Sequence, residues 1–134
     1  MSNIDLVAAH YAAAARGDLP GMLADFDPGI TWVEAAGFPL AGVYTGPEEI
    51  TSSVFGAITS EWRGFGMHVD EYVAQGDTVV ALGRYLASHR ASGRELDART
   101  VHIWRVRAGK LVGFEQLTDT LLVKRASHTA EEAA

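Results

Sequence analysis

Apolar and polar residues alternate most regularly between Leu96 and Arg107, and this alternation predicts a β-strand. Side chains point to opposite faces in turn along a strand, so residues two apart share a face. The more apolar face carries Leu96, Ala98, Thr100, His102, Trp104 and Val106. We expect this face to be buried. The titratable His102 then lies on the inner wall of a sheet, where a chemical pocket can form.

Three helices are predicted before the main run of strands. An alanine-rich helix spans residues 4–16, with capping residues before it and Gly17 directly after it. Asp18 caps a short second helix that continues to residue 24. The third helix covers 45–60 and begins with TGPE, which offers a capping-box spacing and an early proline.

The remaining pattern predicts strands and turns. A turn at 27–29 precedes the first strand, at 30–36. Four further strand-like runs, separated by glycine-containing turns, cover 67–74, 78–89, 96–106 and 111–121. Helices followed by a four-strand meander predict an α+β fold. We expect a curved antiparallel sheet wrapped around the N-terminal helices, a cone-shaped α+β barrel that encloses an apolar pocket.

Length and composition narrow the class of protein. The chain has 134 residues, enough for one domain with one core, which we place at 1–122, followed by a flexible C-terminal tail at 123–134. A formal net charge of −6 gives no indication of binding to nucleic acid or to an anionic membrane. With no secretory leader and no apolar run long enough to span a membrane, we expect a cytoplasmic protein.

Several kinds of chemistry find no support in the sequence. There is no cysteine, which excludes disulfides, thiol catalysis and thiolate metal sites. The sequence also holds no HExxH, no phosphate-binding glycine loop and no G-x-S-x-G. We therefore expect no metal and no cofactor.

Four segments occur in an order that resembles the nuclear-transport-factor-2-like superfamily. They are HYAAAARGDLPGMLADF (10–26), ITWVEAAG (30–37), YTGPEEI (44–50) and HIWRVRAGKLVGFEQLTD (102–119). The superfamily includes ketosteroid isomerases, SnoaL-like polyketide cyclases and limonene-epoxide hydrolases, and the chain looks most like a SnoaL-like member. The resemblance implies the fold but not the reaction, because the same fold carries isomerases, hydrolases, cyclases and plain binding proteins.

Glu34 is the first candidate for acid–base chemistry. It shares a strand face with Ile30 and Trp32, so it continues an apolar stripe toward the interior. Burial would raise the pKa of its carboxyl, which suits a general base near neutral pH. By resemblance, Glu34 falls near the position of the ketosteroid isomerase base. The alternative is a glutamate at a strand end that faces water or pairs with an arginine.

His102 is the second candidate. A partly buried imidazole can donate to a carbonyl oxygen or exchange protons near pH 7. The resemblance places His102 near the protonated aspartate of the ketosteroid isomerase oxyanion hole. A histidine departs from that pattern, which argues against steroid isomerisation. The alternative is a core histidine that is satisfied by a backbone carbonyl.

His10 and Tyr11 lie on the first helix, which lines the cavity in the fold that the sequence resembles. His10 takes the place of the isomerase's oxyanion tyrosine, and Tyr11 is its neighbour. Adjacent helix residues point about 100° apart, so we expect only one of the two to face the pocket fully. Which one does so stays open, and a tyrosine that fills the core is the alternative for Tyr11.

Asp119, near the end of the last predicted strand, resembles the strand-end aspartate of limonene-epoxide hydrolases. Alternation does not decide its face, since two sets of residues compete for the interior and a bulge would choose between them. Arg84 falls near that family's arginine, but Leu86 stands where its second acid is expected. Epoxide hydrolysis is therefore a minor candidate.

The sequence thus predicts a cofactor-independent acid–base enzyme that acts on a hydrophobic, carbonyl-containing small molecule through an enolate, by isomerisation or cyclisation. Glu34 or Asp119 would take a proton next to the carbonyl, and His102, with His10 or Tyr11, would donate to the enolate oxygen. Residues expected to contact this substrate are Trp32, Phe55, Trp62, Arg84, Trp104, Phe114 and Gln116. Aromatic walls would suit a flat aromatic or polycyclic ligand. The alternative is a non-catalytic domain that binds a small molecule or serves as a dimeric scaffold. A homodimer is expected in either case.

Overall fold

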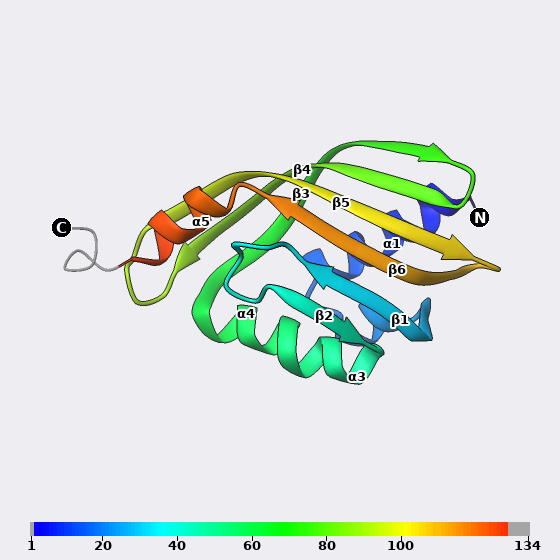
Figure 1. Cartoon of the computed structure of the whole chain (residues 1–134), viewed down its shortest axis with the longest axis horizontal. Helices are drawn as coiled ribbons and strands as arrows, with labels where there is room; N and C mark the ends of the chain where they lie inside the picture. Colours follow the sequence, from blue (N-terminus) through cyan, green and yellow to red (C-terminus); the bar gives the residue numbers. More distant parts are fainter. Residues whose placement is uncertain (1, 129–134) are drawn as a thin grey trace.

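The computed structural model describes residues 2–128 and shows one curved sheet with helices packed against one of its faces (Figure 1). The strands are β1 (Phe26–Glu34), β2 (Gly42–Thr45), β3 (Trp62–Gln75), β4 (Thr78–His89), β5 (Glu95–Arg107) and β6 (Lys110–Thr118). Their order across the sheet is β2-β1-β6-β5-β4-β3. The α+β class is as expected. The sheet does not close into a barrel, because no hydrogen bonds join β2 to β3.

One strand pair departs from the antiparallel expectation. β1 and β6 run parallel, whereas every other neighbouring pair is antiparallel. β1 begins at Phe26, so the turn expected at 27–29 is part of an irregular strand whose register shifts between Phe26 and Thr31. β2, which the sequence analysis did not predict, pairs with β1 and forms one edge of the sheet.

Except for the last one, which the sequence analysis did not predict, the helices lie close to the predicted ranges. They are α1 (Asn3–Ala15), α2 (Leu19–Leu23), α3 (Pro47–Ile50), η1 (Thr51–Phe55), α4 (Gly56–Glu61) and α5 (Thr120–Ser127). α1 starts with a capping box between Ser2 and Asp5. α3, η1 and α4 form one continuous helical segment with a π-helical turn in its middle. Gly46 precedes this segment and makes no side-chain cap, so the capping box expected at Thr45 does not form. None of the helices among residues 2–128 is long and apolar enough to cross a membrane.

The predicted tail is wrong in its first part. Residues 120–127 form α5, in which Val123 is fully buried and Ala126 nearly so. Both pack in a core cluster with β4 and β5 residues, which is why the segment is folded against the sheet. The rest of the expected tail, 129–134, lies outside the described residues.

The inner face of the sheet is the one that the alternation in β5 predicts. All six residues of the more apolar face of β5 are buried, which confirms the prediction for that strand. On β6 a register shift next to Val106 puts Phe114 and Gln116 on the buried face and leaves Leu117 half exposed. The sheet thus presents His102 and its neighbours to the helices.

Candidate functional site

A cavity of about 950 Å³ lies between the inner face of the sheet and the helices. Its volume falls within the range of small-molecule sites in proteins. Residues from α1, α2, η1, α4 and five strands line it. The apolar part of the wall includes Trp32, Val54, Phe55, Phe65, Met67 and Phe114. The polar side chains that matter for chemistry are His10, Tyr11, Glu34, Thr51, Tyr85 and His102.

His102 is the centre of a hydrogen-bond network in this wall. Its Nδ1 lies 2.6 Å from the hydroxyl of Tyr11, and its Nε2 lies 2.6 Å from the hydroxyl of Tyr85. Each tyrosine oxygen also accepts a hydrogen bond from another side chain. Trp104 Nε1 donates to Tyr11 at 2.9 Å, and Gln116 Nε2 donates to Tyr85 at 2.9 Å. Both nitrogens of the imidazole are therefore engaged.

The network is neutral near pH 7. Burial lowers the pKa of His102 to about 3, and the nearby His10 lowers it further in the same direction. Burial also raises the pKa of Tyr11 and of Tyr85 above the ordinary value for tyrosine. The imidazole therefore serves as a hydrogen-bonding group near pH 7, rather than exchanging protons as the sequence analysis allowed.

One tyrosine hydroxyl proton has no acceptor within the network. A neutral imidazole carries one N–H, so His102 donates to one tyrosine and accepts from the other. The tyrosine that accepts from His102 also accepts from Trp104 or Gln116, which engages both of its lone pairs. Its own O–H then has no partner within the network. Because Tyr11 and Tyr85 both line the cavity, this proton is available to a ligand.

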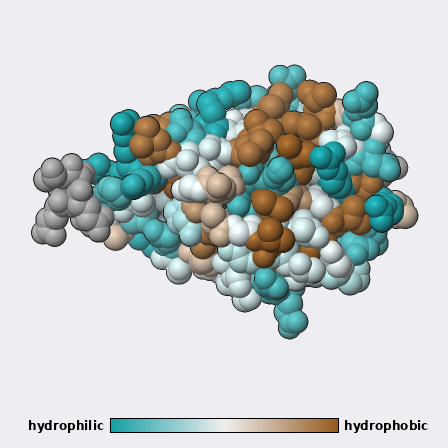
Figure 2. Space-filling model, in the orientation of Figure 1, coloured by the Kyte–Doolittle hydropathy of each residue, from teal (hydrophilic) through white to brown (hydrophobic). Residues whose placement is uncertain are grey.

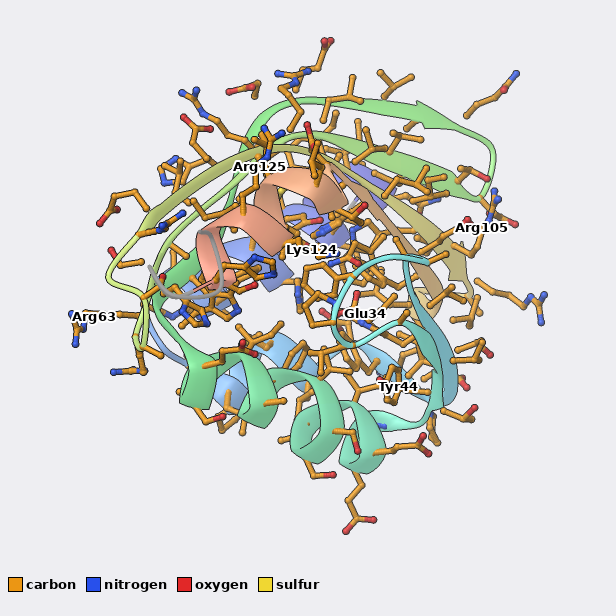
Figure 3. All side chains as sticks on the ribbon, turned by 60° about the vertical axis from the view of Figure 1, so that its left-hand side comes forward. Glu34, Tyr44, Arg63, Arg105, Lys124 and Arg125 are labelled. Atoms are coloured by element: carbon orange, nitrogen blue, oxygen red, sulfur yellow. The ribbon has the colours of Figure 1, made fainter. Side chains whose placement is uncertain are left out.

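Glu34 stands at the end of β1 and faces the same cavity (Figure 3). Its side chain is buried, and desolvation raises the pKa of its carboxyl to about 8. The indole N–H of Trp32 offsets part of this rise, although it does not reach the geometry of a hydrogen bond. The ion pairs found within residues 2–128 do not include Glu34. Neither the water-facing nor the arginine-paired alternative therefore applies to it.

The side chain of Gln116 connects the end of β1, next to Glu34, with the network around His102. Its side-chain oxygen accepts from the backbone N–H of Ala35 at 3.0 Å, which leaves its amide nitrogen to donate to Tyr85. Ala35 follows Glu34 directly, so one amide side chain connects the end of β1 with the network around His102. Gln116 is fully buried and does not line the cavity. It is thus a positioning residue rather than the substrate contact that the sequence predicts.

The structure answers the question left open for the first helix. Both His10 and Tyr11 line the cavity, but only Tyr11 joins the network. His10 donates from Nδ1 to the carbonyl of Met22 at 3.0 Å and stacks on Phe26. Burial lowers the pKa of His10 to about 4, so it too is neutral near pH 7. The reading considered for His102, a core histidine satisfied by a backbone carbonyl, fits His10 instead.

The structure does not bring four other predicted residues to the cavity wall. Asp119 is exposed and caps α5 by accepting from the N–H of Leu122. Arg84 points outward and pairs with Asp97 at 3.6 Å. Trp62 is buried in the core cluster that also contains Val123 and Ala126, and Trp104 is fully buried behind Tyr11.

Tyr85 is the functional candidate that the sequence analysis missed. Alternation along β4 places it on the buried face with Val79, Ala81 and Gly83, so the pattern did contain the signal. The resemblance implies a role for the neighbouring Arg84 instead, which the same alternation places on the outer face.

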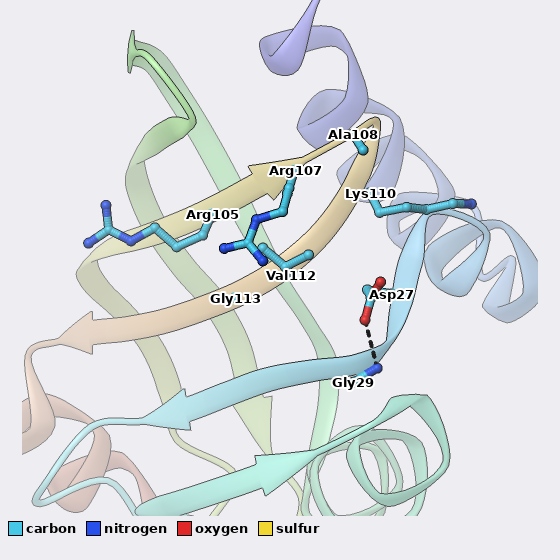
Figure 4. Close-up of a pocket in the computed structure, with 8 residues that line it drawn as sticks. All are labelled: Asp27, Gly29, Arg105, Arg107, Ala108, Lys110, Val112 and Gly113. Carbon is cyan, nitrogen blue, oxygen red and sulfur yellow. Dashed lines mark hydrogen bonds between the residues drawn. The ribbon is translucent and has the colours of Figure 1, made fainter.

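A second hollow, of about 500 Å³, lies away from this site near the β5–β6 turn (Figure 4). Its rim carries Arg105, Arg107 and Lys110, all exposed, and the Asp27 carboxylate that accepts from the N–H of Gly29. It holds no buried titratable group. Across residues 2–128 there is also no group of three or more His, Asp or Glu side chains placed to hold a metal ion.

The chain is similar to one family of domains and to several proteins of known structure. Residues 7–114 match the model of the SnoaL-like domain family. An NTF2-like protein from Burkholderia thailandensis E264 is 45% identical, with a TM-score of 0.92 over 96% of this chain and 98% of that one. An NTF2-like protein of unknown function from Burkholderia pseudomallei K96243 is 29% identical, with a TM-score of 0.89 over 96% and 100%. TerC, co-crystallised with polyporic acid, is 26% identical, with a TM-score of 0.85 over 93% and 97%. No curated protein matches the chain.

Proposed function

Because the chain belongs to the family of SnoaL-like domains, we propose that its cavity is the active site of an acid–base enzyme that needs no cofactor. The substrate is a hydrophobic small molecule with a carbonyl group. One observation carries the proposal: a buried carboxyl of raised pKa and an unused tyrosine hydroxyl face the same largely apolar cavity.

The two groups have complementary roles in enolate chemistry. The ionised Glu34 takes a proton from the carbon next to the carbonyl, and the electrons of that C–H bond move into the enolate. The spare hydroxyl of Tyr11 or Tyr85 donates to the oxygen, where negative charge develops. Return of the proton from Glu34 to another carbon isomerises a double bond. Alternatively, the enolate carbon attacks a second carbonyl, and the alkoxide that forms takes the proton from Glu34, which closes a ring.

The surroundings of Glu34 and of the tyrosines support these two roles. A raised pKa makes Glu34 a stronger base than an exposed carboxylate, and the apolar wall strengthens hydrogen bonds to the enolate oxygen. His102 stays neutral, so the oxygen receives a hydrogen bond rather than a full positive charge. TerC, which shares the fold and was co-crystallised with polyporic acid, is consistent with an organic ligand in this cavity.

Proton exchange on a model ketone tests the proposal without knowledge of the natural substrate. We expect the protein to accelerate the exchange of the α-protons of 2-tetralone in D₂O, followed by NMR. Replacing both tyrosines, Tyr11→Phe with Tyr85→Phe, removes every hydroxyl of the network and should lower the rate by about 10²–10³-fold. A double variant that exchanges as fast as the wild type would exclude the tyrosine donor.

The outer face of the sheet supports a homodimer as the assembled form. Strand register aligns Val73, Val80 and Ile103 in one row across β3–β5, and Leu82, Val101 and Leu117 in a second row across β4–β6. Apolar side chains gather over β3–β5 on this face (Figure 2), and Val73 and Leu117 are each about half exposed. A second copy of the chain would cover both rows, and twofold dimers are the commonest closed assembly.

Light scattering after gel filtration tests the dimer. We expect the mass of two chains for the wild type and of one chain for Ile103→Lys, because the lysine would place a charge in the middle of the covered rows. Val43→Lys is the control: Val43 is more exposed, but it lies on the edge strand β2, outside the rows. A monomeric wild type, or an Ile103→Lys variant that remains dimeric, would rule out this interface.

A further inference from the structure

Only one nitrogen of the His10 imidazole has a hydrogen-bond partner within residues 2–128. Nδ1 lies 3.0 Å from the carbonyl oxygen of Met22, and a carbonyl oxygen can only accept, so Nδ1 carries a proton. Met22 belongs to the last turn of α2, where the carbonyl groups have no partner within the helix. The bond therefore satisfies the end of α2 and at the same time fixes the tautomer of His10.

The other ring nitrogen of His10, Nε2, is an acceptor near pH 7. Burial lowers the pKa of His10 to about 4, so the ring is neutral. A neutral imidazole with its proton on Nδ1 has a lone pair on Nε2, which can accept a hydrogen bond but cannot donate one. By resemblance, His10 takes the place of a tyrosine that donates to an oxyanion. In this chain the position holds an acceptor instead.

Nε2 is open to the cavity although the ring is buried. His10 is only 6% exposed, and it lines the cavity. Within residues 2–128, the side-chain atoms that are both fully enclosed and without a partner belong to Trp32 and Thr51. Nε2 also lacks a partner but is not one of these enclosed atoms, so it keeps some open surface. Phe26 stacks on the imidazole and Trp104 meets it edge-on at 4.9 Å, which leaves the cavity as the side from which a ligand reaches it.

An open acceptor in an apolar wall selects ligands that carry a donor. An apolar group placed against Nε2 would remove water from the lone pair without replacing the hydrogen bond, which costs free energy. A negatively charged oxygen at the same place would be repelled by the lone pair. An O–H or N–H group would make the missing bond. The ring centroids of His10 and Tyr11 are 5.4 Å apart, so one small molecule can contact both Nε2 and the network around His102.

We propose that Nε2 of His10 is an acceptor subsite of the cavity, which binds a neutral O–H or N–H group of the ligand. His10 then takes no part in holding the enolate oxygen, a role that the proposed function gives to the tyrosines. The inference rests on the proposed function in needing a small molecule in the cavity, but it does not need turnover. A ligand that suits the whole site presents an acceptor to the spare tyrosine hydroxyl and a donor to His10.

Binding of two matched naphthalenes tests the subsite. Calorimetry at pH 6.5 compares 2-naphthol, whose O–H can donate, with 2-methoxynaphthalene, whose oxygen can only accept. His10→Phe keeps a planar ring but has no nitrogen. The affinity ratio in favour of 2-naphthol should be about tenfold higher in the wild type than in His10→Phe, the effect of one hydrogen bond. Any loss of packing that both ligands share cancels in this ratio.

His68→Phe is the control for the binding experiment, because His68 also lines the cavity but is exposed. It should keep the wild-type ratio. The same ratio in wild type and His10→Phe would overturn the subsite, and so would a wild type that does not bind 2-naphthol.

Nitrogen NMR of protein labelled with ¹⁵N at histidine provides a second measurement, on the wild type itself. At pH 6.5 His10 should show a protonated Nδ1 and an unprotonated Nε2. The Nε2 signal should move toward that of a hydrogen-bonded nitrogen with 2-naphthol and not with 2-methoxynaphthalene. The signals of His10 are those missing from His10→Phe, or from His10→Asn, whose amide can still donate to Met22, if the first variant does not fold. A protonated Nε2, or the same response to both ligands, would contradict the proposal.

Binding and turnover are measured separately, so failure of the subsite is distinguishable from failure of the proposed function. A protein that binds 2-naphthol through His10 but exchanges no α-protons of 2-tetralone would refute the enzyme and leave the subsite intact. A protein that exchanges these protons, but whose affinity ratio does not depend on His10, would do the reverse.

Discussion

Glu34→Gln should lower the rate of α-proton exchange on 2-tetralone by about 10²–10⁴-fold, the contribution typical of a general base. The amide keeps the shape of the side chain but cannot accept the proton. Glu115→Gln is the matched control, because Glu115 lies on β6, is not buried and does not line the cavity. It should exchange at the wild-type rate. An exchange rate in Glu34→Gln close to that of the wild type would remove Glu34 from the mechanism.

The pH dependence of the wild-type rate follows from the same group. A base acts only when ionised, and burial raises the pKa of Glu34 to about 8. The catalysed rate should therefore rise with pH and level off above about pH 8, once the background exchange is subtracted. His102 and His10 stay neutral over this range, because burial lowers the pKa of each to about 3 and about 4. A rate that levels off near pH 4.5, the ordinary value for glutamate, would contradict the assignment.

Glu34 should also make the wild type lose stability as the solution becomes alkaline. The pKa of this carboxyl is raised from 4.5 in the unfolded chain to about 8 in the folded one, so between these values the folded state retains a proton that the unfolded state has lost. Its stabilising effect is complete below pH 4.5 and is lost as the pH rises through 8. The stability of Glu34→Gln relative to the wild type should thus increase by on the order of 4 kcal/mol between pH 4.5 and 9.

Urea unfolding at pH 5, 7 and 9 measures this difference. His10 and His102 have lowered pKa values, so their contribution is present above pH 6.5 and is lost as the pH falls through their folded values. That contribution is common to both proteins and cancels in the difference between them. Curves of stability against pH that run parallel for wild type and variant would show that Glu34 titrates in the same way in the folded and unfolded states.

Alternation of side chains along the strands was sufficient to identify two residues of the candidate site. It placed His102 on the buried face of β5 and Glu34 on the buried face of β1, and the structure shows both in the cavity wall. Both inferences needed only a local property, the period of two residues along a strand. Tyr85 was accessible by the same reasoning on β4.

The supporting residues were not predictable in this way. The role of Trp104 depends on how α1 packs against β5, since its partner is Tyr11. The role of Gln116 depends on which residues face one another across β4, β5 and β6, and a register shift in the β5–β6 pair determines this on β6. Alternation also predicts the face on which a side chain lies, but not whether the side chain reaches the cavity. It does not distinguish Phe114, which reaches the cavity, from Trp104, which is buried behind Tyr11.

The sequence did not distinguish a catalytic role of Asp119 from a role as a helix cap. A strand-end aspartate resembled a member of an acid–base pair, but the carboxylate caps α5, a helix that the sequence analysis had assigned largely to the tail. The segment from residue 120 folds because Val123 and Ala126 are buried. The apolar residues of α5 are a run at 121–123 and Ala126, and so short a run is as compatible with the end of the preceding strand as with a helix of eight residues.

Direct titration of Glu34 by NMR is the most decisive measurement, since the proposed chemistry requires a buried carboxyl of raised pKa in the cavity. Protein labelled with ¹³C at the glutamate carboxyl carbons gives one signal for each glutamate, and Glu34→Gln identifies the signal of Glu34. A midpoint near pH 8 is the expected result. A midpoint near 4.5 would mean that water solvates the carboxylate, and the acid–base site described above would then lack its base.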